Sequence, residues 1–390
     1  MTASVLTKLM IYFDNNATTQ IAPEVFAAMR PFLETEHWNP SSAYERGKET
    51  AKVVESARES VAVLLGVAKA DDIAFTSGGT ESDNWAILGA LEANPEKDHI
   101  ITTRVEHDAV RKLCEKRERQ GKRVTWLDVD EDGTLDIDLL RSSLDEQTAV
   151  VSVMMANNET GILFPVEGIA EIVKENSDAL FHVDGVNAAG KIAIDLRSTE
   201  IDLFSVSAHK FYGPKGIGAL YIRDGVELPS MYFGGGQENG RRAGTEAVHQ
   251  IAGIGAAAEY VKDLSPMQLV GEMRDRLETA ILTTIPDAFL NGTSDTVKRL
   301  PNTSYISFAN TNGEAILAML DEAGVCVSTG SACNSQEHAA SAVLQAMNVP
   351  YARAMGAIRF SLGRNNTAAE VETVIEVLPG IIENLRKLGN

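Results

Sequence analysis

The sequence predicts an α/β protein with a large unit built on a mostly parallel sheet, followed by a smaller α+β unit. The first two thirds of the 390 residues alternate short apolar runs with helical patterns, which is typical of parallel strands joined by crossover helices. A long Ala-rich helical pattern then ends near Asp263, and Ser265-Pro266 marks a break in the chain. Hydrophobic residues make up 44% of the chain, so disorder over most of its length is excluded.

The expected strands and helices follow one another in a regular order. The run 149–154 is apolar apart from Ser152, as expected for a strand covered on both faces. We expect residues 1–15 to pack with the small unit, residues 16–265 to form the large unit and residues 266–390 the small one. Helices are expected at 81–92, 109–119 and 166–175, and strands at 73–76, 100–103, 124–127, 149–154, 180–183, 201–207 and 218–222.

The charge balance and the cysteine count narrow the possible functions. Asp and Glu number 55 against 35 Lys and Arg, and a net charge of −20 repels phosphate backbones, so no direct nucleic-acid binding is expected. No apolar run is long enough to span a membrane, and residues 1–11 lack the features of a signal peptide. Three scattered cysteines argue against a disulfide framework and favour the cytoplasm.

The turn at residues 77–80 is a candidate anion site. Gly78 and Gly79 lie between an expected strand and the helix after it, where glycine lets the backbone approach a ligand closely. The start of that helix offers free N–H groups to an anion, and Thr80 adds a hydroxyl. The alternative is a tight turn in which Thr80 only caps the helix.

Two further strand ends carry polar residues. Asp184 can pair with a protonated ring nitrogen or, alternatively, cap a turn. Ser207 and His209 can hold a phosphate, and Lys210 can form a Schiff base with an aldehyde, whereas Lys215 lies in a Gly-Pro-Lys-Gly turn that faces solvent. Because ligands bind beyond the carboxyl ends of parallel strands, these groups are expected at one edge of the sheet. An anion site, a carboxylate and a lysine together suggest pyridoxal phosphate.

Three more residues are candidates for the same site. His107 follows a strand, where it can stack on a cofactor ring and move protons; alternatively it is a helix-terminal histidine held by Asp108 or Glu106. Arg359 lies in an apolar run and needs an anionic partner, either a substrate carboxylate or an internal salt bridge. Thr245 ends a glycine-rich loop, where it is expected to cap the next helix and offer its hydroxyl to a phosphate.

Of the three cysteines, Cys333 is the candidate nucleophile. It stands among small and hydroxylic residues that indicate an exposed loop, and an exposed thiol is available for reaction; the alternative is a surface cysteine without a role. Cys326 has apolar neighbours and is expected in the core, and Cys114 has no assigned role. No metal-ligand spacing is present, so no metal site is expected.

Together these motifs resemble the cysteine desulfurases of the NifS/IscS type, within the fold-type I (class V aminotransferase-like) pyridoxal phosphate enzymes. The resemblance extends over nearly the whole chain and implies their fold: a mostly parallel sheet of seven strands in a large cofactor-binding domain, with a smaller domain that carries the catalytic cysteine loop. The motifs that carry the resemblance lie at residues 13–19, 39–42, 76–82, 105–107, 156–161, 207–210, 241–245, 330–333 and 359–361.

The resemblance implies a homodimer that converts L-cysteine to L-alanine with pyridoxal 5'-phosphate and transfers sulfur to an enzyme cysteine as a persulfide. A sulfur-acceptor protein, such as an iron–sulfur scaffold, then takes that sulfur. The implied catalytic residues are Lys210 as the Schiff-base lysine, His107 for ring stacking and proton transfer, and Cys333 as the sulfur-accepting nucleophile. The substrate-binding residues are Asn158 and Arg359. The cofactor-binding residues are Gly79, Thr80, His107, Asn158, Asp184, Asn187, Ser207, His209, Lys210 and, from the neighbouring subunit, Thr245.

The chain departs from the family pattern at Asn187, where a glutamine usually reaches the cofactor ring oxygen. Asparagine is one methylene shorter, about 1.5 Å less reach. Selenocysteine lyase activity and sulfur supply for tRNA or DNA modification are alternatives that share this site, although a pure lyase needs no Cys333. A catalytically retired binding protein is the alternative from another class, but such a protein should have lost Lys210, His107 or Cys333, and all three are present.

Overall fold

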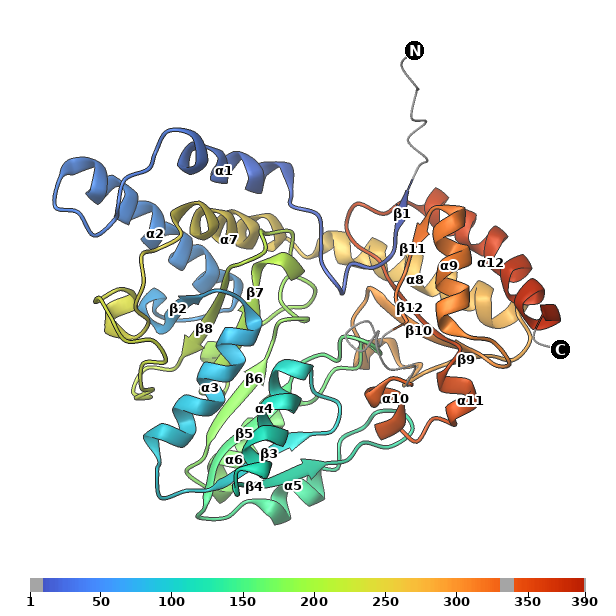
Figure 1. Ribbon diagram of the computed structural model, residues 1–390, viewed down its shortest axis with the longest axis horizontal. Coiled ribbons are helices and arrows are strands. Elements are labelled where there is room, and N and C mark those ends of the chain that lie inside the picture. Colours follow the sequence, from blue (N-terminus) through green and yellow to red (C-terminus); the bar gives the residue numbers. More distant parts are fainter. Residues whose placement is uncertain (1–9, 330–339, 389–390) are drawn as a thin grey trace.

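The computed structural model describes residues 10–329 and 340–388, which form two lobes side by side (Figure 1). The larger lobe contains a seven-stranded sheet of spatial order β2-β8-β7-β6-β5-β3-β4. Strand β8 runs antiparallel to both neighbours and all other pairs are parallel, which confirms the predicted mostly parallel sheet. The strands are β2 (Ile73–Thr76), β3 (His99–Thr103), β4 (Arg123–Leu127), β5 (Thr148–Met154), β6 (Leu180–Asp184), β7 (Leu203–Ser207) and β8 (Gly218–Ile222).

One strand begins later than predicted. The sequence favoured a strand from residue 201, but β7 begins at Leu203. The reason is Arg223, whose guanidinium donates hydrogen bonds to the main-chain oxygens of Thr199 and Ile201. A side chain therefore satisfies these carbonyls in place of a neighbouring strand.

Helices cover both faces of the large sheet. Helix α3 packs across β5, β6, β7 and β8, which brings its N-terminus to the end of the central strands. Helices α1 and α2 pack against α7 on the opposite side (Figure 1). Thr245 was wrongly predicted to cap α7, because that helix begins at Val248 with Ala247 as its N-cap. The helices of this lobe are α1 (Pro23–Glu34), α2 (Glu45–Leu64), α3 (Gly79–Ala93), α4 (Asp108–Arg119), α5 (Ile137–Ser143), α6 (Val166–Asn176) and α7 (Val248–Val261).

The smaller lobe contains an antiparallel sheet of order β12-β10-β9, with helices α8 and α9 packed against it and α12 packed against these two helices. Pro266 stands in the first turn of α8, where proline is tolerated. Strand β1 pairs in parallel with β11, so the described N-terminal residues lie on this lobe (Figure 1). Its elements are β1 (Ile11–Tyr12), α8 (Ser265–Thr284), β9 (Ala288–Leu290), β10 (Thr303–Phe308), α9 (Gly313–Ala323), β11 (Val325–Cys326), α10 (Ala342–Ala346), α11 (Tyr351–Ala354), β12 (Ala357–Ser361) and α12 (Ala368–Leu388).

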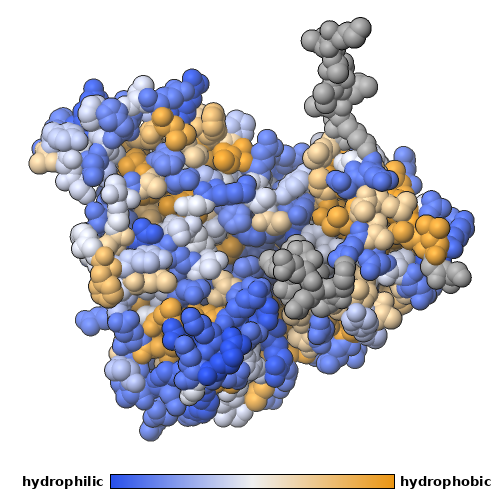
Figure 2. Space-filling model, in the orientation of Figure 1, coloured by the Kyte–Doolittle hydropathy of each residue, from blue (hydrophilic) through white to orange (hydrophobic). Residues whose placement is uncertain are grey.

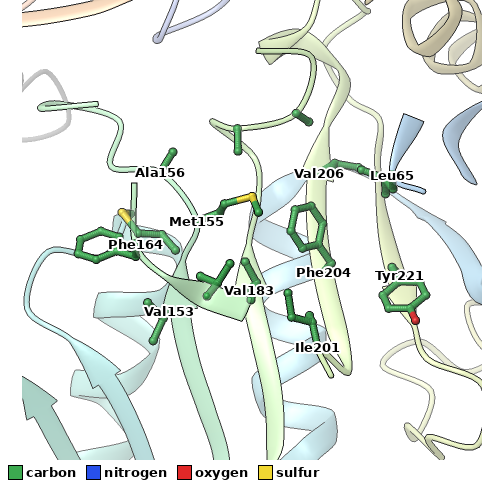
Figure 3. Close-up of a cluster of buried hydrophobic side chains, with 14 of the residues drawn as sticks. Leu65, Val153, Met155, Ala156, Phe164, Val183, Ile201, Phe204, Val206 and Tyr221 are labelled. Carbon is green, nitrogen blue, oxygen red and sulfur yellow. The ribbon is translucent and has the colours of Figure 1, made fainter. Parts of the chain in front are cut away.

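One buried apolar cluster lies mainly in the large lobe and continues to Tyr305 and Ala357 of the small lobe, and a second cluster lies within the small lobe. In the large lobe, Val153, Val183 and Phe204 lie on three neighbouring strands, and their side chains belong to one buried cluster (Figure 3). In the small lobe, Phe308 and Phe360 are fully buried. Cys326 was predicted in the core but is only half-buried, because β11 is a two-residue strand at the surface of this lobe.

Much of the face shown in Figure 2 is hydrophilic, and its apolar residues are scattered among polar ones. Among the described helices, none has the length and apolar character needed to cross a membrane.

Candidate active site

A pocket lies where the carboxyl ends of β6 and β7 meet the start of α3. Among the predicted site residues that the structure describes, every one lies in its lining except Thr245. The pocket also contains residues that sequence reasoning did not single out, notably Asp83, Asn16 and Ala17. The lining consists of Asn16, Ala17, Gly79, Thr80, Asp83, His107, Met154, Ala156, Asn158, Asp184, Val186, Asn187, Ser207, His209, Lys210 and Arg359.

The start of α3 forms one end of the pocket. Gly78 is the N-cap, with a φ of 149° that favours glycine, so Thr80 lies inside the helix and the alternative role of Thr80 as its cap is wrong. A Cβ on Gly79 would lie 2.7 Å from Cγ2 of Val186, so only glycine allows this close approach. The N–H groups of the first helical turn have no acceptor in a preceding turn, and they supply donors for an anion.

Lys210 and His209 lie just beyond β7, on a short 3₁₀ helix, Ala208–Lys210. The Lys210 Nζ donates hydrogen bonds to the main-chain oxygens of Asn16 (2.5 Å) and Ala17 (3.0 Å). The Nδ1 of His209 lies 3.2 Å from the hydroxyl of Thr18, and burial lowers the pKa of His209 to about 4, so its ring is neutral at physiological pH. Lys215 is exposed, as predicted.

Asp184 ends strand β6 at the floor of the pocket. Its Oδ1 accepts a hydrogen bond from the Val186 N–H at 2.9 Å, so this carboxylate both stabilises the turn and lines the pocket. Burial raises the pKa of Asp184, and the neighbouring His107 and Lys210 oppose that shift. The groups around Asp184 therefore offset part of the cost of burying its negative charge.

His107 is the N-cap of α4. Its Nδ1 accepts a hydrogen bond from the Ala109 N–H at 3.2 Å, so His107 is a helix-terminal histidine, as the alternative interpretation had it. The group that holds the ring is this main-chain N–H and not Asp108 or Glu106. Burial lowers the pKa of His107, and the neutral ring then carries its proton on Nε2. A neutral, oriented imidazole is suited to stack on a ring and to transfer a proton.

Arg359 extends into the pocket from β12, so the pocket is built by both lobes. Its Nη1 donates to the main-chain oxygen of Asn158 at 3.0 Å, and its Nη2 pairs with Oδ1 of Asp14 at 2.6 Å. The internal salt bridge considered as the alternative is therefore present. The Nε of Arg359 is buried and has no hydrogen-bond partner among the described residues, which leaves one donor for a carboxylate.

Asn187 is oriented by a buried lysine. The Lys191 Nζ donates to the side-chain Oδ1 of Asn187 at 3.0 Å and to its main-chain oxygen at 2.7 Å. Burial lowers the pKa of Lys191, and the nearby charges of Lys210 and Arg359 act in the same direction. Because its oxygen is taken by Lys191, Asn187 presents its amide N–H groups to its other neighbours.

The two remaining predicted residues are Thr245 and Cys333. Thr245 is exposed and outside the pocket lining of its own chain. Cys333 lies outside the described residues. On one side of the segment 330–339, Ser328 exchanges main-chain hydrogen bonds with Arg359; on the other, the hydroxyl of Ser341 donates to the carboxylate of Glu159. Arg359 lines the pocket, and Glu159 directly follows Asn158, which also lines it.

The fold and the pocket define an enzyme of the class-V aminotransferase family. The family model described as "Aminotransferase class-V" matches residues 11–374, and the chain belongs to this family. Members of the family depend on pyridoxal phosphate.

Similar proteins agree with this assignment. A protein of Trichormus azollae named "Cysteine desulfurase" is 50% identical over 382 residues, covering 97% of this chain and 94% of that protein. A solved "NifS-like protein" is 38% identical with a TM-score of 0.90, covering 97% of this chain and 100% of that one. A structure described as "SspA in complex with cysteine" is 33% identical with a TM-score of 0.81, covering 92% of this chain and 100% of that one.

Proposed function

We propose that this chain is a pyridoxal phosphate-dependent cysteine desulfurase that supplies sulfur for iron–sulfur cluster assembly. The observation that carries the proposal is one pocket in which the amine of Lys210, the carboxylate of Asp184 and the guanidinium of Arg359 converge. Relatives named as cysteine desulfurases and a related structure that holds cysteine support the choice of substrate.

The residues of the pocket fit pyridoxal phosphate. The start of α3, with Gly79 in a position that has no room for a Cβ, suits the phosphate, together with Ser207 and His209. Asp184 would pair with the ring nitrogen, and Asn187 and Asn158 would lie near the ring oxygen. When bound through Lys210, the cofactor supplies an electron sink for the bonds broken at the substrate.

The side chains of this enzyme then have distinct tasks. The guanidinium of Arg359 binds the substrate carboxylate and so fixes the position of the cysteine sulfur. The amine of Lys210 takes the proton from Cα of the substrate and later returns it to Cα. The neutral ring of His107 assists delivery of a further proton to Cβ, equivalent to the one that the Cys333 thiol releases when it becomes a thiolate.

The thiolate of Cys333 attacks the substrate sulfur. The substrate's C–S bond breaks, an S–S bond forms on Cys333, and Cβ gains a proton. L-alanine leaves, and the enzyme retains a persulfide.

Two partners complete the proposal. Thr245 is exposed and away from its own pocket, and Phe233, on the same glycine-rich segment, is 87% exposed. Both features support a homodimer in which Thr245 reaches the phosphate of the neighbouring subunit. A sulfur-acceptor protein would take the persulfide sulfur, and the sparse cysteines support a cytoplasmic location.

The test is release of alanine and sulfide from L-cysteine by the full-length protein, with pyridoxal phosphate and a thiol reductant present. We expect equal amounts of alanine and sulfide. The Lys210→Ala variant should lose at least about 100-fold in rate, because a general acid–base group is removed, whereas the exposed Lys215→Ala variant should not. Absence of alanine from wild-type protein loaded with cofactor would refute the proposal.

A further inference from the structure

A second carboxylate shares the pocket with Asp184. Asp83 lies on α3, four residues after Gly79, and helix geometry places residues of this spacing on the same face. Because α3 packs across β6 and β7, this face lies against the ends of those strands. Asp83 is only 1% exposed, yet it lines the pocket as Asp184 does.

Nothing in the described part of the chain neutralises a charge on Asp83. Its Oδ1 has no hydrogen-bond partner there, and the basic group within reach is His182, whose Nε2 lies 3.6 Å away. The His182 ring is already engaged on both sides, with Ser152 at Nδ1 and Ser205 at Nε2, each at 2.9 Å. Burial lowers the pKa of His182 to about 3, so this ring is neutral at physiological pH and offers no positive charge.

The other ionisable groups around Asp83 are carboxyl groups: Asp184 adds negative charge, whereas burial raises the pKa of Glu106 to about 8. Asp184 faces it from β6, and Glu106 approaches from the segment between β3 and α4. Burial, followed by the charge of Asp184, raises the pKa of Asp83 well above its ordinary value. Two buried carboxylates without a counter-charge between them do not both ionise.

The surroundings decide which of the two keeps its proton. Asp184 accepts a hydrogen bond from the Val186 N–H and has the amine of Lys210 nearby, and both favour its anionic form. Asp83 has only the hydroxyl of Ser205 to lower its pKa, its Oδ1 has no hydrogen-bond partner among the described residues, and the causes of its pKa shift include no positive charge. The proton therefore belongs on Asp83.

We propose that Asp83 is a positioning residue that stays protonated, so that Asp184 alone presents a negative charge to the cofactor ring. The inference rests on the proposed function, because it takes Asp184 as the partner of the ring nitrogen. A protonated Asp83 is close in shape and charge to asparagine. A charged Asp83 would instead double the negative charge at this end of the pocket.

The variant Asp83→Asn, made in the full-length protein, distinguishes a protonated Asp83 from a charged one. The first readout is the infrared difference spectrum between wild type and variant at neutral pH. We expect the C=O band of a protonated carboxyl group to be lost in the variant. If the variant instead lost the bands of an ionised carboxylate, and no band of a protonated carboxyl group were lost, the proposal would be overturned.

The second readout is the dissociation constant of pyridoxal phosphate, together with the pH midpoint of its bound absorbance. Asp83→Asn should change both by less than about threefold, whereas Asp184→Asn should weaken cofactor binding by more than about tenfold. A tenfold effect of Asp83→Asn would show that a charge had been removed and would overturn the proposal.

These measurements also distinguish the inference from the proposed function. If the protein did not bind pyridoxal phosphate, the proposed function would fail, yet the infrared spectrum would still report where the proton lies. If Asp83→Asn failed to fold, wild-type protein carrying carbon-13 in its aspartate carboxyl groups would answer the same question. A protonated aspartate band at neutral pH supports the inference, and its absence overturns it.

Discussion

Arg359 and Asp14 form an ion pair between the last strand of the small sheet and the start of the chain, with Nη2 and Oδ1 2.6 Å apart. The arginine side chain is only 4% exposed, and the carboxylate 19%. The group proposed to bind the substrate carboxylate is therefore already oriented by a carboxylate of the protein. The same pair joins the segment that follows β1 to β12, so it also contributes to stability.

Removing Asp14 should destabilise the protein. Asp14→Ala leaves a buried guanidinium without its acceptor, and we expect the free energy of unfolding to fall by about 1.5–3 kcal/mol. Urea unfolding measures this change. Glu34→Ala, which removes an exposed partner of Arg30, is the control and should leave the midpoint unchanged. Equal midpoints for all three proteins would contradict the structural role of the pair.

Replacing Arg359 should weaken cysteine binding more than it affects the chemistry. Lysine cannot reproduce the planar set of donors, so Arg359→Lys should raise KM for L-cysteine by about 10–100-fold, with a smaller effect on kcat. Cofactor affinity should not change. Arg276→Lys, at an exposed arginine of the same lobe, is the matched control. An unchanged KM in Arg359→Lys would mean that the substrate carboxylate binds elsewhere.

Strand ends made the site predictable from the sequence. The apolar run at 149–154 corresponds to β5, and all seven residues of that strand are buried. Asp184 and Ser207 end parallel neighbours, so their positions at one edge follow from the sheet itself. Each of these signals lies within a few residues of the group that it predicts.

Contacts between distant segments could not be predicted in this way. Asp14 and Arg359 are 345 residues apart, and no local pattern joins them. Asp83 resembles any acidic residue on a helix, although its spacing of four from Gly79 was a usable signal. Thr245 was misplaced as a helix cap because composition alone does not reveal that the loop continues to Ala247.

Glu159 should make stability depend on pH. Burial raises the pKa of Glu159 to about 7, whereas an unfolded glutamate titrates near about 4.3. Between these values the folded state binds more protons than the unfolded state, so stability falls as pH rises through this window. In Glu159→Gln, the decrease in the free energy of unfolding across this pH window should be smaller by up to about 3 kcal/mol. Urea unfolding at several pH values measures this difference.

The control for this change is Glu24→Gln, which removes the charge of an exposed glutamate. If Glu159→Gln showed the same pH profile as wild type, Glu159 would not carry the proton. A steeper fall in the variant would reverse the sign of the effect.

Gly185 and Phe204 should be energetically coupled. A Cβ on Gly185 would lie 1.9 Å from Cζ of the fully buried Phe204, so Gly185→Ala should destabilise the protein by about 1–3 kcal/mol. Combining it with Phe204→Leu should recover about 1 kcal/mol relative to the sum of the single changes. Gly168→Ala, on an exposed helical position with open space, is the control and should stabilise by up to about 1 kcal/mol. Strict additivity of the first two changes would show that the ring does not limit this site.

The central claim is that sulfur moves from L-cysteine to Cys333. The most direct measurement is a single turnover without reductant, followed by quantification of alanine and by mass spectrometry of the cysteine-containing peptides. The account predicts one alanine per active site and one added sulfur atom on the peptide that contains Cys333, with neither Cys114 nor Cys326 labelled. Alanine formed at the same yield by Cys333→Ala, or sulfur found on Cys326, would contradict it.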